Sequence, residues 1–285
     1  MSGRQPSRRR ARTIVVALTA VVVSSGLLRA QEAVISGRDL LLTAGATAGA
    51  VGLSHFDRRI ARMFSDSGFH VRHSGFTTSA KRASIVTETV LMATGGVVYG
   101  VGRIRRDDGV ADVGLHTTES IASAAMFIQV VRGVLGRARP YVVEDNGQKH
   151  DAEPYDFQPL HGFTSFNYRS FPSMHAMASF AAASALTEEM RVRRTRDRQV
   201  IGPVLFVGAA MPALARMYLD EHWASDIAMG VFLGVLSGQK VVLYSHAHPG
   251  NPIDRRFLRR AVQATVRLDG RGASFSLSPI QSFIR

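Results

Sequence analysis

Cysteine is absent from this chain of 285 residues. Without thiols the protein has no disulfide framework, no thiolate zinc site and no cysteine nucleophile, and a thiol-free chain suits an oxidising compartment. Strong overall hydrophobicity is also missing, because the mean hydropathy of +0.04 argues against a multi-span transporter. The sequence has no internal repeat, no low-complexity tract and no shift of composition that would mark a second domain.

Acidic residues are in the minority. The chain has 35 Lys and Arg against 22 Asp and Glu, a net charge of +13, within an ordinary globular balance of 46% hydrophobic and 20% charged residues. An excess of positive charge suggests an anionic partner such as phosphate, a lipid headgroup or nucleic acid. Six arginines and no acid lie in residues 1–30, so the rest carries only +7. We therefore expect a phosphorylated small molecule or lipid as partner and no nucleic acid.

The N-terminal segment has the pattern of an export signal. Five arginines between positions 4 and 12 precede an apolar stretch, residues 13–28, and the sequence continues through Arg29 to Ala30. We expect residues 1–30 to be a signal peptide, cut after Ala30, that sends the protein to the periplasm or cell envelope. The alternative is an uncleaved anchor, for which the apolar stretch is short of about 20 residues.

Residues 31–250 predict one all-α domain, a helical bundle of about six core helices. Apolar stretches of 14 to 19 residues, rich in Ala, Leu, Met and Val, favour helices over strands. They cover residues 40–53, 85–101, 117–135, 173–186, 200–215 and 227–244.

Long loops and a separate tail complete the predicted organisation. Residues 55–84 and 140–171 are expected to be loops, and loops of that length in a compact domain are usually functional. Residues 251–285 form a basic tail, in which 254–266 predict an amphipathic helix that either lies on a membrane surface or packs on the bundle. Residues 273–278 alternate in polarity and predict a short strand.

The first candidate functional segment is Arg132-x6-Arg139-Pro140. Proline disfavours helical backbone in the residue before it, so the third helix is expected to end at Arg139. Positions seven apart share a helix face, where two guanidiniums could converge on one anion. The alternative is that these arginines only favour the negative end of the helix dipole.

The second segment is Phe171-Pro172-Ser173-Met174-His175. Pro172 suits the start of a helix, so the backbone N–H groups of Ser173 and Met174 are expected to point out of the helix N-terminus and bind an anion. His175 would lie one turn inside, placed to donate a proton. A plain helix start with a surface histidine is the alternative.

The third segment is Arg216-x5-His222-x3-Asp226. A carboxylate four residues from a histidine can hold one imidazole nitrogen and direct the other outward. Arg216 would lie off that face on a continuous helix, so we expect a break near residues 220–221 that returns Arg216 to the site. A solvated His–Asp pair is the alternative.

Three other groups of polar residues are considered as metal ligands and are interpreted as structural or solvated. His116 and Glu119 have i, i+3 spacing but are interpreted as polar helix-face residues. Residues 107–108 and 188–189, Asp-Asp and Glu-Glu, are interpreted as solvated charges at a turn and a helix end. Neither pair has the partners that a metal site requires, so no metal is expected.

Together, the three segments resemble the type 2 phosphatidic acid phosphatase and vanadium haloperoxidase superfamily. Its pattern is Lys-x6-Arg-Pro, then Pro-Ser-Gly-His, then Ser-Arg-x5-His-x3-Asp. The resemblance spans residues 40–245 and includes the order of helices and motifs, which puts all three motifs at one end of the bundle.

The resemblance implies a role for each motif residue. His222 would attack phosphorus and form a phosphohistidine, Asp226 would orient it, and His175 would protonate the leaving oxygen. No metal would be needed, and the reaction would depend on positioning and charge stabilisation. The groups expected to bind the phosphoryl oxygens are Arg132, Arg139, Ser173, Met174 and Arg216.

The sequence departs from the family pattern at three positions. Arg132 replaces Lys, which keeps the charge but changes the donor geometry. Met174 replaces Gly and Ala215 replaces Ser, and none of the three changes removes a proposed catalytic group. The Met174 side chain is expected to narrow the mouth of the pocket and so to influence rate and substrate.

The resemblance leaves location and chemistry open. The family includes six-span lipid phosphatases and soluble exported enzymes, and we expect an exported helical domain that is either free or membrane-attached. The expected activity is a metal-independent phosphatase for a phosphomonoester or a pyrophosphate, with lipid-linked substrates included. The alternatives are a haloperoxidase with vanadate as cofactor and a non-catalytic envelope protein on the same scaffold.

Overall fold

The computed structural model describes residues 35–64, 74–143, 149–248, 250–257, 262–269 and 272–279. Six long helices form the bundle, and each overlaps one of the predicted helical stretches over most of its length, so the all-α prediction is confirmed. They are α2 (Gly37–Ser54), α6 (Glu88–Arg105), α7 (Asp108–Leu135), α9 (Met174–Val192), α10 (Arg198–Tyr218) and α11 (Ala224–Ala247). The predicted signal peptide, residues 1–30, lies outside the described residues.

Helix α9 is the centre of the bundle and packs against α7, α10 and α11. Three glycines of α11 at intervals of four residues bring its backbone against α9. A Cβ at Gly230 would lie 2.5 Å from the Ser173 carbonyl oxygen, and one at Gly234 would lie 2.4 Å from the Met177 carbonyl oxygen. At Gly238 the nearest side-chain atom would be 2.6 Å away. This small-residue contact fixes the first turns of α9 and α11 side by side.

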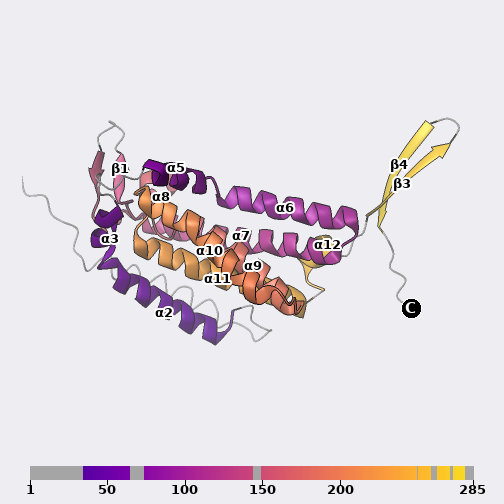
Figure 1. The fold of residues 1–285 in the computed structure, drawn as a ribbon, viewed down its shortest axis with the longest axis horizontal. Helices are drawn as coiled ribbons and strands as arrows, with labels where there is room; N and C mark the ends of the chain where they lie inside the picture. The colour runs from indigo at the N-terminus through magenta and orange to yellow at the C-terminus, as the bar shows by residue number, and fades with distance from the viewer. Residues whose placement is uncertain are drawn as a thin grey trace, which may run out of the picture.

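Short elements cover one end of the bundle (Figure 1). They are α3 (Asp57–Phe64), α5 (Ser74–Ala83), α8 (His161–Thr164), the 3-10 helix η2 (Phe166–Tyr168), and the antiparallel strands β1 (Tyr141–Val143) and β2 (Lys149–Asp151). The other end is covered by α12 (Pro252–Phe257). The irregular connection predicted over 140–171 is confirmed, because its elements are only three or four residues long.

The loop predicted over 55–84 is wrong in part, because α3 and α5 lie within it. In α3, Ile60 and Phe64 are four residues apart and half-buried, whereas Arg58, Arg59 and Arg62 are exposed. The run of arginines hid this helical spacing in the sequence.

Helix α7 ends at Leu135, four residues before the predicted end. Gly136 has a φ of +57°, a left-handed conformation that favours glycine, and its N–H donates to the Arg132 carbonyl at 3.0 Å. A Cβ at Gly136 would lie 1.7 Å from the Gln158 carbonyl oxygen. The prediction that Arg132 and Arg139 share a helix face is therefore wrong.

The tail also differs from the prediction. Helix α12 ends at Phe257, and Val262–Asp269 forms strand β3, so the helix predicted over 254–266 is wrong from Val262 onward. Val262, Thr265 and Val266 are β-branched and favour a strand. The short strand predicted over 273–278 is confirmed within β4 (Gly272–Pro279), which pairs antiparallel with β3.

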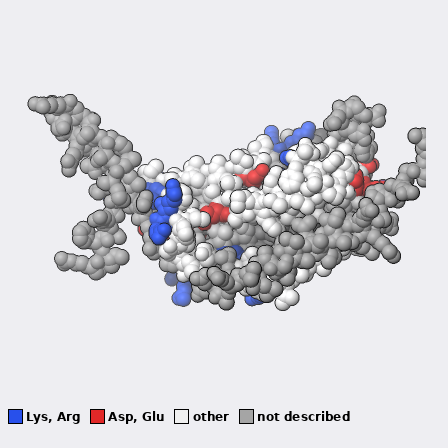
Figure 2. Space-filling view, turned by 180° about the vertical axis from the view of Figure 1, so that it is seen from behind, with Lys and Arg blue, Asp and Glu red and all other residues white. Residues whose placement is uncertain are grey.

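The surface of the bundle is suited to a membrane. Helices α10 and α11 are long and apolar enough to cross one, and α5 and α6, bent by 56°, would form a third span if they act together. On α10, Val204, Val207 and Met211 are each more than 60% exposed. Figure 2, a view from behind, shows that most of the described surface on the face seen there is uncharged, with Lys and Arg in a few separate groups. These features indicate membrane association.

Candidate active site

The second and third motifs meet where α9 and α11 begin. Ser173 is the N-cap of α9, and its side chain accepts a hydrogen bond from the Ala176 N–H at 3.4 Å. The Ser173 N–H donates to the Asp226 carbonyl at 3.1 Å. The prediction that this N–H is free for an anion is therefore wrong, because the bond is used to join the two helix starts.

His222 lies in the link between α10 and α11. The predicted break is confirmed: α10 ends at Tyr218, Asp220 has a φ of +55°, and α11 begins at Ala224. His222 thus precedes the helix that contains Asp226, and its Nδ1 lies 3.7 Å from Asp226 Oδ2. Both side chains are buried. This distance is longer than a hydrogen bond but close enough for the carboxylate to orient the imidazole.

Asp226 is held by several donors. Its Oδ2 accepts from the Trp223 N–H at 2.8 Å and from Ser170 Oγ at 2.5 Å, and its Oδ1 accepts from Arg137 Nη1 at 2.5 Å. The carboxylate is fixed before any substrate binds, so the His222 ring has a defined orientation.

Arg137 is the main residue that the sequence analysis missed. Its side chain is 2% exposed, and besides Asp226 it donates to Asp57 Oδ2 at 2.7 Å and to Ser225 Oγ at 2.7 Å. Asp57 in turn accepts from the Ser225 N–H at 2.9 Å. Arg137 is therefore a positioning residue that ties α3 to the first turn of α11. Its place in Arg137-x-Arg139-Pro140 was a signal, but Asp57 had none.

Arg139 and Arg216 share one carboxylate. Glu221 forms an ion pair with Arg139, and its Oε2 lies 2.9 Å from Arg216 Nη2. Arg139 is buried and also donates from Nε to the Phe166 carbonyl at 3.1 Å. Burial, with Arg216 and Arg132 nearby, lowers the pKa of Arg139 to about 9, so it stays charged at neutral pH.

Arg132 completes the group of arginines. It lies in the last turn of α7, and its Nε is buried without a hydrogen-bond partner among the described residues. Arg169 is a second residue that the sequence analysis missed. Its positive charge is near enough to lower the pKa of both Arg132 and Arg139. Four guanidiniums against the Glu221 carboxylate make this end of the bundle a place where an anion is stabilised.

Both histidines are held in the neutral form. Burial lowers the pKa of His175 to about 3, assisted by Arg216 and His222 and opposed by a backbone hydrogen bond to Ser84. Burial also lowers the pKa of His222 to about 4, where Asp226 opposes and Arg139 and Arg216 assist. At pH 7 each imidazole therefore has a lone pair available.

The Met174 side chain does not lie at the pocket. It is 4% exposed and packs in the core that contains Ile121, Ile128 and Met177. The expectation that it narrows the pocket mouth is wrong, because the first turn of α9 directs this position into the bundle. Only its backbone N–H remains a candidate for phosphate.

Three comparisons with known proteins bear on this site. A family model described as "PAP2 superfamily" matches residues 114–248, from within α7 to just beyond α11. A similar solved structure is that of the "first transmembrane PAP2 type phosphatidylglycerolphosphate phosphatase from Bacillus subtilis". It is 18% identical, with a TM-score of 0.39 and with 70% of this chain and 96% of that chain covered. Among the curated proteins none matches.

The matched segment contains all three motifs and the residues brought together around His222. The resemblance predicted from the motifs is thus confirmed, since the PAP2 superfamily model matches residues 114–248 of the helical domain.

Proposed function

We propose that this chain hydrolyses a phosphomonoester or a pyrophosphate through a phosphohistidine at His222, with no metal at the reacting centre. The match of residues 114–248 to the PAP2 superfamily supports an enzyme of the phosphatase type. The observation that carries the finer proposal is the neutral His222, oriented by Asp226 beside the guanidiniums of Arg139 and Arg216.

His222 is the proposed nucleophile. Its Nδ1 faces Asp226, so Nε2 is the nitrogen that would attack phosphorus. The P–N bond forms while the bond from phosphorus to the leaving oxygen breaks. The imidazole gains positive charge as it does so, and the fixed Asp226 carboxylate stabilises that charge. The 3.7 Å separation is expected to shorten in this step.

The arginines supply the charge stabilisation. Guanidiniums present paired N–H donors that match phosphoryl oxygens and stay protonated. Arg132, Arg139 and Arg216 would hold the three equatorial oxygens, with the Met174 N–H at the start of α9 as a further donor. The Glu221 carboxylate forms ion pairs with Arg139 and Arg216. Substrate binding therefore requires these two ion pairs to break.

His175 is the proposed acid and base. In the field of the arginines its pKa is about 3, too low for it to hold a proton at neutral pH. A phosphate dianion bound between those arginines would raise the pKa again. The imidazolium then gives its proton to the leaving oxygen. The neutral imidazole later takes a proton from the water that cleaves the phosphohistidine.

A lipid-linked phosphate is the proposed substrate class. Around the arginines the chain exposes large apolar side chains, Phe76 on α5, Phe163 on α8 and Phe166 on η2, each at least 47% exposed. The Phe166 ring lies 3.8 Å from the Arg139 guanidinium carbon, so apolar and cationic surfaces adjoin. With α10 and α11 able to cross a membrane, this surface fits a phosphate carried on a lipid.

The cell envelope is the proposed location. Residues 1–30 would direct export, and α10 and α11 would hold the bundle in or on the membrane. N-terminal sequencing of the envelope fraction should find Gln31 as the first residue. A protein that still begins at Met1 would show instead that residues 1–30 form an uncleaved anchor.

A phosphate-release panel tests the proposal. The full chain, purified in detergent, is assayed on p-nitrophenyl phosphate, phosphatidic acid, phosphatidylglycerol phosphate and undecaprenyl pyrophosphate. We expect release from at least one lipid at a rate well above that from the soluble ester, and none from the His222→Ala variant. Absence of release from every substrate contradicts the proposal. Halide oxidation on addition of vanadate would favour the haloperoxidase alternative instead.

A further inference from the structure

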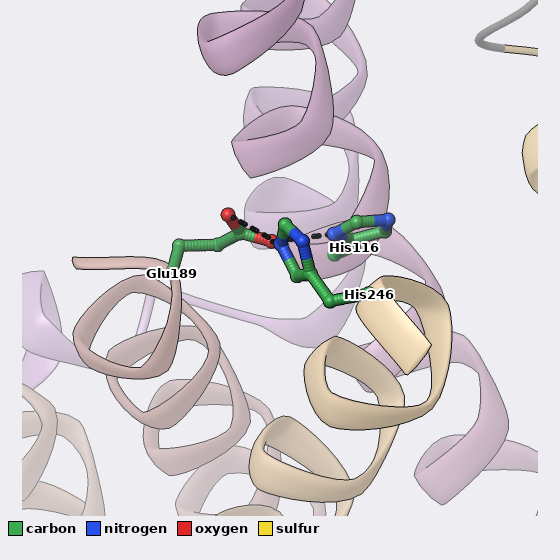
Figure 3. Close-up of side chains that lie close together, drawn as sticks. All are labelled: His116, Glu189 and His246. Atoms are coloured by element: carbon green, nitrogen blue, oxygen red, sulfur yellow. Dashed lines mark hydrogen bonds and ion pairs between the residues drawn. The ribbon is translucent and has the colours of Figure 1, made fainter. Parts of the chain in front are cut away.

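Three potential metal ligands, His116, Glu189 and His246, point towards one another (Figure 3). Glu189 and His246 lie near the C-terminal ends of α9 and α11, whereas the active site lies where these two helices begin. His116 comes from α7, Glu189 from α9 and His246 from the last turn of α11. His116 Nδ1 lies 2.5 Å from Glu189 Oε1, and His246 Nε2 lies 3.0 Å from the same oxygen. Their ligand atoms all lie within 4.8 Å of one another. The structure thus corrects the interpretation of Glu189 as a solvated helix-end charge, and His116, interpreted as a polar helix-face residue, is also buried.

The surroundings of this cluster contain buried polar atoms without hydrogen-bond partners among the described residues. Glu119 and Asp254 each have a buried carboxylate oxygen with no hydrogen-bond partner in the described part of the chain, and so does the His116 Nε2 atom. Both carboxylates interact electrostatically with His116, and Asp254 Oδ1 lies 3.6 Å from His116 Nε2. Buried polar atoms without partners are costly, and a cation bound at this point would interact favourably with the two carboxylate oxygens.

Carboxylates outnumber guanidiniums among the described residues around the cluster. Four carboxylates border the cluster, Asp112, Glu119, Glu189 and Asp254, whereas Arg193 is the guanidinium that contacts it. Arg193 Nε binds Glu189 Oε2 at 3.0 Å and its Nη2 binds Asp112, whereas Glu189 Oε1 contacts both histidines. His246 Nε2 lies 3.1 Å from Glu189 Oε2 as well, so this imidazole faces both oxygens of the carboxylate.

We propose that His116, Glu189 and His246 bind one divalent metal ion of the zinc class. Two imidazole nitrogens and one carboxylate oxygen form a donor set typical of Zn²⁺ and its first-row neighbours. The ligands would be His116 Nδ1, His246 Nε2 and Glu189 Oε1, with water or the Glu119 carboxylate in the fourth position. Adjacent ligands of a tetrahedral zinc site lie roughly 3.3 Å apart, within the 2.5 to 4.8 Å found here.

The neighbours of the three ligands suit this assignment. With Nδ1 on the metal, His116 Nε2–H points towards Asp254, the carboxylate–histidine–metal arrangement that fixes a ring and raises its basicity. Arg193 holds the second oxygen of Glu189 in the same way. His246 is 28% exposed and leaves a path by which an ion can enter.

The role of this ion is structural. His116 lies 16 residues before Arg132 on α7, which at 1.5 Å per residue is about 24 Å from the proposed phosphate site. An ion held by α7, α9 and α11 would tie together the three helices that carry the motifs, at the end remote from them. The assignment is independent of the proposed phosphatase chemistry, since no step of that chemistry uses it.

Metal titration of the full chain tests the site. The protein is purified in detergent with a histidine-free tag, stripped with a chelator and titrated with Zn²⁺ and Co²⁺. We expect one equivalent to bind, with visible absorption of four- or five-coordinate Co²⁺ and a melting temperature raised by about 5 °C at a hundredfold excess over Kd. No stoichiometric binding by the wild-type chain overturns the proposal.

Matched variants locate the ion. His246→Ala and Glu189→Gln should lose both the absorption and the thermal shift, whereas His248→Ala, two residues further along, should keep them. His246 is the least buried of the three ligands, so its variant decides the outcome if Glu189→Gln fails to fold. Unchanged binding in a folded His246→Ala protein, checked by circular dichroism, overturns the assignment, because the ion would then be held elsewhere.

Discussion

Arg137 donates a hydrogen bond to Asp226 at 2.5 Å, and both side chains are buried. The two residues are far apart in the sequence, yet this contact sets the orientation of the carboxylate beside His222. Arg137 also forms an ion pair with Asp57, so one guanidinium contacts two buried carboxylates. A buried ion pair of this kind costs most when one partner is removed.

Loss of Arg137 is therefore expected to destabilise the fold as well as the site. Arg137→Ala should lower the free energy of unfolding by about 3–5 kcal/mol, because Asp57 and Asp226 would both lose the guanidinium with which they form buried ion pairs. Arg137→Lys should cost less stability but still lower kcat, because one ammonium cannot serve both carboxylates. Thermal unfolding and kcat measured in the same detergent check both. Wild-type stability in Arg137→Ala would contradict the role.

Glu221 is expected to compete with the substrate. Its carboxylate engages Arg139 and Arg216, two of the proposed phosphate ligands. Glu221→Gln removes the competing charge and should tighten competitive inhibition by vanadate about threefold to tenfold. Asp220→Asn, the neighbouring acid, is the control and should leave the inhibition constant near its wild-type value. Weaker inhibition of Glu221→Gln would show that Glu221 assists binding instead.

His175 is expected to matter in proportion to the leaving group. Removal of a general acid costs about 10²–10⁴ in rate for a poor leaving group such as a lipid alkoxide. A good leaving group such as p-nitrophenolate needs little protonation, so His175→Ala should retain much more of that activity. Steady-state kinetics on one substrate of each kind give the comparison. Equal losses on both would remove His175 from the role of acid.

Stability should fall in mild acid because of the two neutral histidines. The pKa of His222 is about 4 and that of His175 about 3 in the fold, below the ordinary value of about 6.5 for the unfolded chain. The unfolded state therefore binds more protons between pH 6.5 and 4, and each histidine can lower stability by up to about 1.4 kcal/mol per pH unit.

Variants isolate this effect from the titration of carboxylates. His222→Asn and His175→Asn should each reduce the fall in melting temperature between pH 7 and pH 5, whereas His55→Asn, an exposed histidine, should leave it as in wild type. An unaltered pH dependence in both active-site variants would show that these histidines are not held neutral.

The sequence was most informative where the signal is local. Stretches of Ala, Leu, Met and Val predicted every long helix, and three short motifs predicted the residues that meet around His222. Pro140 predicts that α7 ends at Arg139. The helix ends earlier because Gly136 adopts a positive φ, which the sequence pattern did not indicate.

The parts of the site that the sequence did not predict depend on contacts between residues far apart in the chain. Asp57 lies 168 residues from Ser225, to which it is hydrogen-bonded, and no pattern in the sequence connects them. Glu189 was interpreted as solvated because it ends an α-helix beside another acid. Its burial depends on His116 and His246, from two other helices that only the packing of the bundle brings near.

The phosphohistidine is the central claim, and rapid quenching tests it most directly. Wild-type protein is mixed with ³²P-labelled substrate, quenched in alkali and digested, and the labelled peptide is sequenced. The account predicts an acid-labile, alkali-stable label on the peptide that contains His222, and no label or turnover in a folded His222→Ala protein. Wild-type turnover by that variant, or a label on another residue, would contradict it.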